Sequence, residues 1–165
     1  KPKGAIIIGA NTPGIMIPEL IKVGIIPTMP FKAGNIAVLS KSGTLLYEIS
    51  DALTTAGFGQ SITIGIGGDP VNGTRLIDAF DMIKDIPDLE GLVIVGEIGG
   101  DSEEILAQRI MDSGFKKPNV AYNDGRVANK EMRRECAEEL VMGRLGSSES
   151  QIQTFTQANN RVTKR

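Results

Sequence analysis

Residues 35–44, with the sequence NIAVLSKSGT, decide the fold of this chain. The apolar run that ends at Ser40 is typical of a buried strand, and Gly43 allows a tight turn directly after it. From residue 44 to residue 56 apolar side chains recur on one helical face, and Gly57 ends the pattern. A strand that turns directly into a helix begins a βαβ unit, so this segment predicts a parallel sheet flanked by helices.

The turn between this strand and this helix is a candidate anion site. Helix N–H groups without a partner and the positive end of the helix dipole both lie there. The hydroxyls of Ser40, Ser42 and Thr44 add donors beside Gly43. An ordinary helix cap with a glycine turn accounts for the same residues equally well.

The same alternation continues along the chain. Further strands are expected at residues 5–8, 61–66, 92–96 and 119–122, and further helices at 74–84, from 101 or 102 to 114, and at 130–142. We therefore predict a flavodoxin-like, doubly wound α/β fold with a mainly parallel sheet of about five strands, formed by residues 35–165. Residues 1–34 are expected to be an irregular lead-in whose apolar side chains pack on the body or on a partner.

The composition is that of one aliphatic globular domain. Of the 165 residues, 41% are hydrophobic but only 4% aromatic, and the net charge of −2 neither attracts nor repels nucleic acid overall. A single cysteine excludes an internal disulfide, and the lack of a Cys/His cluster excludes a structural zinc site. No apolar run is long enough to cross a membrane. Basic residues cluster at 116–134 and 161–165, and we interpret them as solvated faces and a frayed tail.

Two more glycine-rich motifs follow predicted strands. Residues 65–70 have the sequence GIGGDP, which allows a sharp turn but is a weak signal alone. Residues 96–100 have the sequence GEIGG and place Glu97 at the carboxyl end of a strand, where ligands gather in open α/β sheets. A carboxylate bound to backbone N–H groups is the alternative for Glu97.

Together, the three motifs resemble the ligase domain of the succinyl-CoA synthetase α-subunit family, which includes ATP-citrate lyase. The resemblance extends to GANTPG at 9–14, SGTLLYE at 42–48 and GFGQS at 57–61, so it covers essentially the whole chain. In that family a histidine is phosphorylated with ATP or GTP and inorganic phosphate. The phosphoryl group then passes to succinate, which CoA captures.

The resemblance implies roles for the motif residues. Ser42, Gly43 and Thr44 correspond to the helix start that holds the phosphate, and Glu97 matches the carboxylate that orients the phosphorylated histidine. A second such helix comes from the family's β subunit, so the resemblance implies a site shared between chains.

Two departures from the family pattern bear on function. The chain contains no histidine, and Cys136 stands where the family's Gly-His-Ala-Gly loop has its histidine. The family's amino-terminal CoA-binding Rossmann domain is also expected to be missing from this chain.

Cys136 is expected to pack rather than to react. The surrounding residues are almost all helix formers, and Cys136 recurs with Met132 and Leu140 on one apolar face. The nearby Glu135 and Glu138 would disfavour the thiolate, which is the reactive form.

We therefore predict a catalytically degenerate ligase-like domain, a pseudoenzyme that acts as an accessory subunit of a larger protein complex. The expected partner is a succinyl-CoA synthetase β-like subunit or a large assembly. No cofactor and no metal are expected, and phosphate or another anion is the ligand class that fits the turn. A first residue Lys1 in place of Met fits a cleaved targeting segment or a partial chain, so we expect a mitochondrial setting, with the cytoplasm as the alternative.

Two other functions stay open. The chain could be part of an active acid–CoA ligase whose CoA domain and nucleophile lie on other chains. The basic carboxyl-terminal segment also leaves open a ribosome- or nucleic-acid-associated protein.

Overall fold

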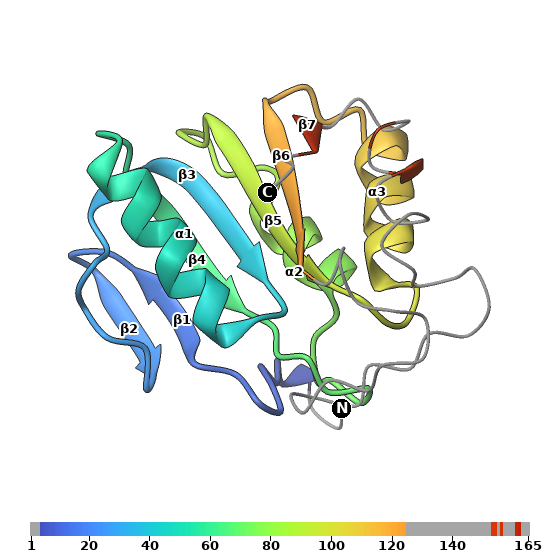
Figure 1. Cartoon of the computed structure of the whole chain (residues 1–165), viewed down its shortest axis with the longest axis horizontal. Helices are drawn as coiled ribbons and strands as arrows, with labels where there is room; N and C mark the ends of the chain where they lie inside the picture. The colour runs from blue at the N-terminus through green and yellow to red at the C-terminus, as the bar shows by residue number, and fades with distance from the viewer. Residues whose placement is uncertain (1–3, 125–152, 155, 157–160, 163–165) are drawn as a thin grey trace.

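The structure, a computed structural model, describes residues 4–124, 153–154, 156 and 161–162. Within this part of the chain, seven strands form one mixed sheet in the order β2-β1-β4-β3-β5-β6-β7 (Figure 1). The strands are β1 (Gly14–Ile17), β2 (Ile21–Gly24), β3 (Ala33–Ser40), β4 (Gln60–Gly65), β5 (Gly91–Glu97), β6 (Asn119–Asp124) and β7 (Arg161–Val162). The helices are α1 (Gly43–Thr55), α2 (Leu76–Ile83) and α3 (Ser102–Asp112).

The parallel part of the sheet has flavodoxin-like topology. Strands β4, β3, β5, β6 and β7 lie side by side and run parallel. Numbered along the chain from β3, they follow the order 2-1-3-4-5, which is the order of the flavodoxin-like doubly wound fold. The predicted fold class is therefore confirmed. The short β7 at Arg161–Val162 was not predicted.

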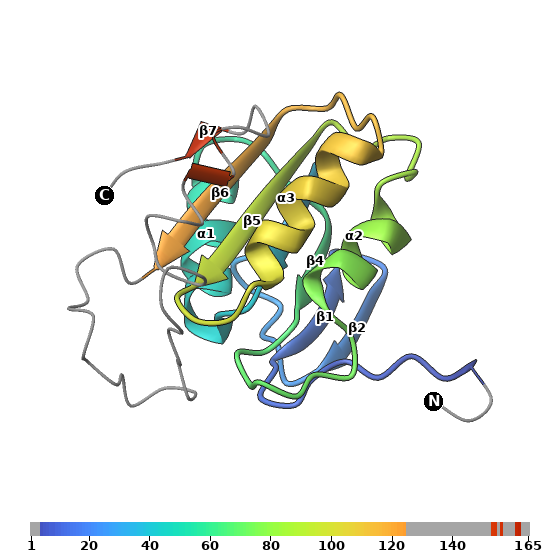
Figure 2. The ribbon, with the colours of Figure 1, turned by 90° about the vertical axis from the view of Figure 1, so that its right-hand side faces the viewer.

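Helices cover both faces of the sheet, as Figure 2 shows from the side. Helix α1 packs on β3 and β4 on one face, and α2 and α3 pack against each other on the opposite face. The larger core lies under α2 and α3 around Phe80, whose ring meets that of Phe115 edge-on with centroids 5.4 Å apart. A smaller core of Met16, Ile26 and Leu46 lies on the other face, beside α1.

Residues 1–34 differ from the prediction in two ways. The stretch 14–24 is not irregular: β1 and β2 form an antiparallel hairpin, and β1 extends the sheet by pairing with β4. Residues 5–8 are not a strand. In this segment the carbonyl oxygen of Ile7 accepts the hydroxyl of Thr74 at 2.6 Å, and Ile8 packs against the larger core. The prediction that this region packs against the body is confirmed by Met16 and Ile26, which are buried beside α1.

The helix predictions at 44–56 and 101–114 are confirmed, but α2 begins at Leu76 and not at residue 74. The side chain of Asp78 accepts the backbone N–H of Arg75 at 3.0 Å and so fixes the start of α2. The same carboxylate bonds the Arg75 guanidinium and raises the pKa of Arg75. The predicted helix at 130–142, which includes Cys136, lies outside the described residues.

In the part of the chain that the structure describes, none of the helices is both long enough and apolar enough to span a lipid bilayer.

Candidate functional site

The candidate site lies where the loops after β3 and β5 diverge. These strands are parallel neighbours, and Ser40 pairs with Val95 near their carboxyl ends. The chain then enters α1 on one face of the sheet and α3 on the other, so the two loops separate and leave a crevice between them. In Figure 1 the arrowheads of β3 and β5 both point toward this end of the sheet.

The first turn of α1 presents free donors to this crevice. Ser42 is the N-cap residue, with extended backbone, and its Oγ accepts the N–H of Leu45 at 3.4 Å. The N–H groups of Gly43 and Thr44 lie in the first helical turn, where no carbonyl of the helix can accept them. An anion held here would also lie at the positive end of the helix dipole.

Ser40 has a different role from the one predicted. Its side chain is fully buried, and its hydroxyl donates to the carbonyl oxygen of Ser42 at 2.6 Å. The Ser40 hydroxyl therefore stabilises the turn from the buried side, and Ser40 is not among the residues that line the pocket. Ser42, Gly43 and Thr44 remain as the candidate anion ligands of the turn.

An open pocket of about 500 Å³ joins this turn to Glu97. Its lining residues come from the lead-in segment, the first turn of α1 and the ends of β4 and β5: Asn11, Thr12, Pro13, Ile25, Lys41, Ser42, Gly43, Thr44, Tyr47, Gly68 and Glu97. The turn after β3, the GIGGDP motif and Glu97 thus each contribute lining residues to one pocket. The pocket offers N–H and hydroxyl donors together with one ammonium, that of Lys41, and one carboxylate, that of Glu97.

Glu97 is half-buried at the last position of β5. Its backbone N–H donates to Oε1 of Glu103 at 3.0 Å, which holds the end of the strand against α3. The Glu97 residue also takes part in a further interaction within the chain.

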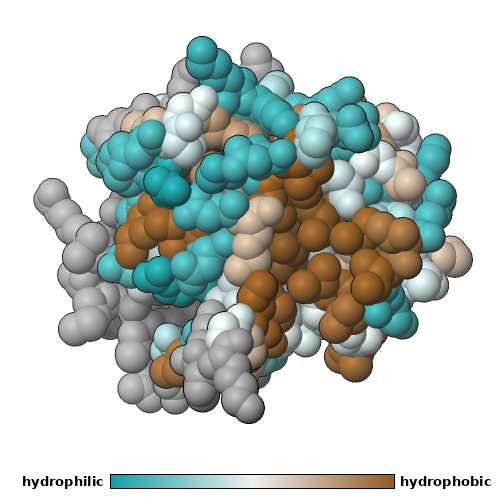
Figure 3. All heavy atoms as spheres, turned by 180° about the vertical axis from the view of Figure 1, so that it is seen from behind, coloured by the Kyte–Doolittle hydropathy of each residue, from teal (hydrophilic) through white to brown (hydrophobic). Residues whose placement is uncertain are grey.

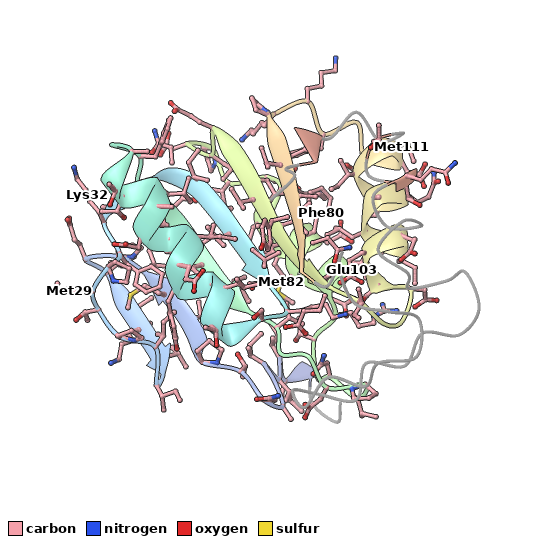
Figure 4. All side chains as sticks on the ribbon, in the orientation of Figure 1. Met29, Lys32, Phe80, Met82, Glu103 and Met111 are labelled. Atoms are coloured by element: carbon pink, nitrogen blue, oxygen red, sulfur yellow. The ribbon has the colours of Figure 1, made fainter. Side chains whose placement is uncertain are left out.

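A buried ion pair that the sequence analysis missed ties the two loops together. Nζ of Lys41 lies 3.1 Å from Oε1 of Glu103, and the two side chains are 10% and 0% exposed. The ammonium also donates to the carbonyl oxygen of Gly99 at 3.3 Å, and the hydroxyl of Ser102 donates to Oε2 of Glu103 at 3.0 Å. Figure 4 shows Glu103 on α3 near the end of β5.

Gly96 makes room for this carboxylate. A Cβ at Gly96 would lie 2.8 Å from Cγ of Glu103, closer than real contacts allow. Two features of the sequence could have indicated the pair. Lys41 is a long cationic residue in a turn of otherwise small polar residues, and Gly96 at the end of the neighbouring strand leaves room for a long side chain.

The lead-in segment forms one wall of the pocket. The hydroxyl of Thr12 donates to the carbonyl oxygen of Gly65 at 2.5 Å. A Cβ at Gly65 would lie 2.7 Å from Cδ of Pro13, and one at Gly67 would lie 2.0 Å from the carbonyl oxygen of Ala10. Gly65 and Gly67 of the GIGGDP motif thus admit the lead-in chain, and Gly68 is the residue of the motif that lines the pocket.

A second pocket of about 500 Å³ lies between the β4–α2 and β5–α3 loops. It shares Lys41 and Gly68 with the first pocket, so the buried ion pair stands between the two. Asp69, Asp101 and Arg75 are the other charged residues in its lining.

Comparisons with known proteins identify relatives of this chain. The sequence profile of the family described as CoA-ligase matches residues 39–161. The α subunit of the ADP-forming succinate–CoA ligase of Methanothermobacter thermautotrophicus is 41% identical over 162 residues, 98% of this chain and 55% of that protein. Its Aquifex aeolicus counterpart is 40% identical over 152 residues, 92% of this chain and 50% of that protein. The chain thus spans about half the length of the curated relatives it matches.

A solved structure shares the fold. The ATP citrate lyase of Methanosaeta concilii, in complex with (3S)-citryl-CoA, superimposes with a TM-score of 0.84 at 22% identity. The match covers 96% of this chain and 28% of that one. At this level of identity, the likeness supports the fold alone.

Proposed function

Because this chain belongs to the CoA-ligase family, we propose that it is the phosphate-binding domain of an acid–CoA ligase of the succinate–CoA ligase type. One observation carries the proposal. The first turn of α1 and Glu97, which lie far apart in the sequence, line the same pocket at the switch point of the sheet.

The chemistry of this pocket suits a phosphoryl group. Phosphate oxygens would accept the N–H groups of Gly43 and Thr44 and the hydroxyl of Ser42, with the helix dipole behind them. Backbone N–H groups do not change their charge or position during a reaction, so they can hold the group before and after transfer. The pocket is open, which leaves room for a second chain to close the site.

The nucleophile and the CoA-binding part of such a ligase would come from elsewhere. Phosphoryl storage on nitrogen needs an imidazole, and the 165 residues contain no histidine. The family's histidine position holds Cys136 between Glu135 and Ala137. Phosphate binding is therefore the part of the reaction that we assign to this chain.

A second candidate function is that of a catalytically silent accessory subunit. The sequence at the family's Gly-His-Ala-Gly loop supports it, because Cys136 takes the place of the histidine and Glu135 and Glu138 take the places of the two glycines. The similarity to succinate–CoA ligase α subunits supports the active-ligase alternative more than it supports this one.

A hydrophobic face supports a protein partner in either case. On the hairpin of β1 and β2, the side chains of Ile21 and Val23 are 51% and 55% exposed. They lie on the same face of the sheet as Ile15, which packs against the larger core, and Figure 3 shows hydrophobic side chains gathered on that face. The backbone edge of β2 is also the end of the sheet. An exposed apolar strand edge is a common protein-binding surface.

Restoring the histidine loop would separate the two functions. The test variant carries Glu135→Gly, Cys136→His and Glu138→Gly and is incubated with labelled ATP and a succinate–CoA ligase β subunit. The ligase function predicts acid-labile phosphate on the variant and none on the unchanged chain. A variant that binds the β subunit but acquires no label would favour the accessory function. Label on the unchanged chain that disappears in Cys136→Ser would contradict both.

A further inference from the structure

We propose that the Lys41–Glu103 ion pair sets how tightly the pocket at the start of α1 holds an anion. In this arrangement the Lys41 ammonium attracts the anion, and the negative charge of Glu103 cancels most of that attraction. The inference rests on the proposed function, since it concerns the affinity of the same pocket for phosphate.

Lys41 is the source of positive charge closest in sequence to the anion turn, because it directly precedes the N-cap residue Ser42. Among the described residues that line the pocket, it is the one with a cationic side chain, and Glu97 is the one with an anionic side chain. The remaining donors are neutral N–H and hydroxyl groups. The charge of the pocket therefore depends on whether the Lys41 ammonium is compensated.

Glu103 compensates it at short range. The N–O distance is 3.1 Å, and both side chains are nearly or fully buried, so mobile ions screen the pair only weakly. The backbone N–H of Glu97 and the hydroxyl of Ser102 hold the carboxylate in place. In the neighbouring pocket Asp69 and Asp101 are anionic, and the guanidinium of Arg75 is paired with Asp78 at 3.0 Å. A pocket that must release phosphate in each cycle benefits from a cancelled charge.

Single substitutions at the two positions should therefore act in opposite directions. In Glu103→Gln the amide oxygen can still accept the N–H of Glu97 and the Lys41 ammonium, so the contacts persist while the negative charge is lost. In Lys41→Met the cation is lost, and a buried carboxylate remains beside the pocket. A pair with a purely structural role would weaken binding in both variants.

The experiment is a double-mutant cycle on phosphate affinity. Titrate the full chain and its variants with inorganic phosphate at low ionic strength and follow ³¹P relaxation or calorimetry. We expect roughly tenfold tighter binding for Glu103→Gln and roughly tenfold weaker binding for Lys41→Met. The double variant should return close to the original affinity. Lys41→Arg, which keeps the charge, should rescue binding.

A matched control is Glu90→Gln, the same change at the exposed position before β5, at the opposite end of the sheet. It should leave the affinity unchanged. If Lys41→Met does not fold, as judged by circular dichroism, Glu103→Gln and the double variant still decide the question.

Weaker or equal binding in Glu103→Gln would overturn the inference and leave the proposed function standing. If neither the original chain nor Glu103→Gln binds phosphate, the proposed function fails, and the inference fails with it.

Discussion

Single buried polar residues hold α1 and the lead-in segment to the sheet at the end away from the pocket. The clearest example is Gln60, the first residue of β4, which is only 1% exposed. Its Oε1 accepts the N–H of Lys32 at 3.1 Å. Its Nε2 donates to the carbonyl oxygen of Ser50 at 3.1 Å and to the hydroxyl of Thr54 at 3.3 Å. One amide thus bonds three groups from two segments, the lead-in chain and α1.

Gln60→Leu should lower the free energy of unfolding by about 2–3 kcal/mol, because buried polar partners lose their hydrogen bonds. Urea unfolding measures the change. Gln108→Leu is the control: Gln108 is exposed on α3 and bonds only Asp112 among the contacts described, at 2.8 Å. It should cost about 0.5 kcal/mol or less. Equal effects at the two sites would show that the Gln60 bonds contribute little.

Ser42 combines a structural role with the proposed ligand role, and two substitutions separate them. Ser42→Asp keeps a good N-cap, so unfolding should change by only about 0.5 kcal/mol, while its charge should abolish phosphate binding. Ser42→Ala removes the cap and should cost about 1 kcal/mol. The measurements are urea unfolding and phosphate titration of each variant. Undiminished phosphate binding by Ser42→Asp would place the anion somewhere else.

At the scale of elements, the contact between the lead-in segment and the β4–α2 loop depends on glycine. Gly67 has φ of +95°, and a Cβ there would lie 2.0 Å from the carbonyl oxygen of Ala10. Gly57 has a similar φ of +87° but nothing within 4 Å of its Cβ position. The two positions share the backbone cost of an added side chain and differ in the clash.

Gly67→Ala should therefore destabilise the chain more than Gly57→Ala does. We expect about 1 kcal/mol for Gly57→Ala from backbone strain alone, and about 2 kcal/mol or more beyond that for Gly67→Ala. Thermal or urea unfolding of both variants measures the difference. Similar losses would mean that the lead-in segment moves away at little cost.

The sequence predicted the βαβ elements well and the lead-in hairpin not at all. Strands β3, β4 and β5 are buried apolar runs, and a glycine or a helix cap ends each of them. The apolar pattern and the residues that end it therefore indicated the same strands. In β1, Met16 faces the small core beside α1, and Ile15 packs on the core of the opposite face. Apolar residues on both faces remove the alternation that identifies a strand.

The candidate site was predicted in part for a related reason. The position of Glu97 and of the Ser42–Thr44 turn followed from strand ends in a parallel sheet. The inward bond of Ser40 and the Lys41–Glu103 pair depend on how two loops meet in space. No local sequence pattern predicts how these two loops contact each other.

At the scale of the whole molecule, the hydrophobic face of the β1–β2 hairpin should be the surface that binds a partner. Val23→Lys adds a charge at a side chain that is already 55% exposed, so the fold should tolerate it. We expect it to weaken binding to a succinate–CoA ligase β subunit at least about tenfold, as loss of an interface centre does. Met111→Lys, at another exposed apolar position on α3, is the control and should bind normally. Analytical ultracentrifugation of the mixtures measures both, and equal binding by the two variants would contradict the assignment.

The central claim is that the start of α1 binds phosphate, and the most direct test is a titration of the ¹⁵N-labelled chain with inorganic phosphate. We predict saturable shifts of the amide signals of Gly43 and Thr44, accompanied by a shift at Glu97 across the pocket. Lys84, Lys116 and Lys117 line a separate pocket and offer cations to any anion that binds by charge alone. Shifts centred on those lysines, or no saturable shift at Gly43 and Thr44, would contradict the account.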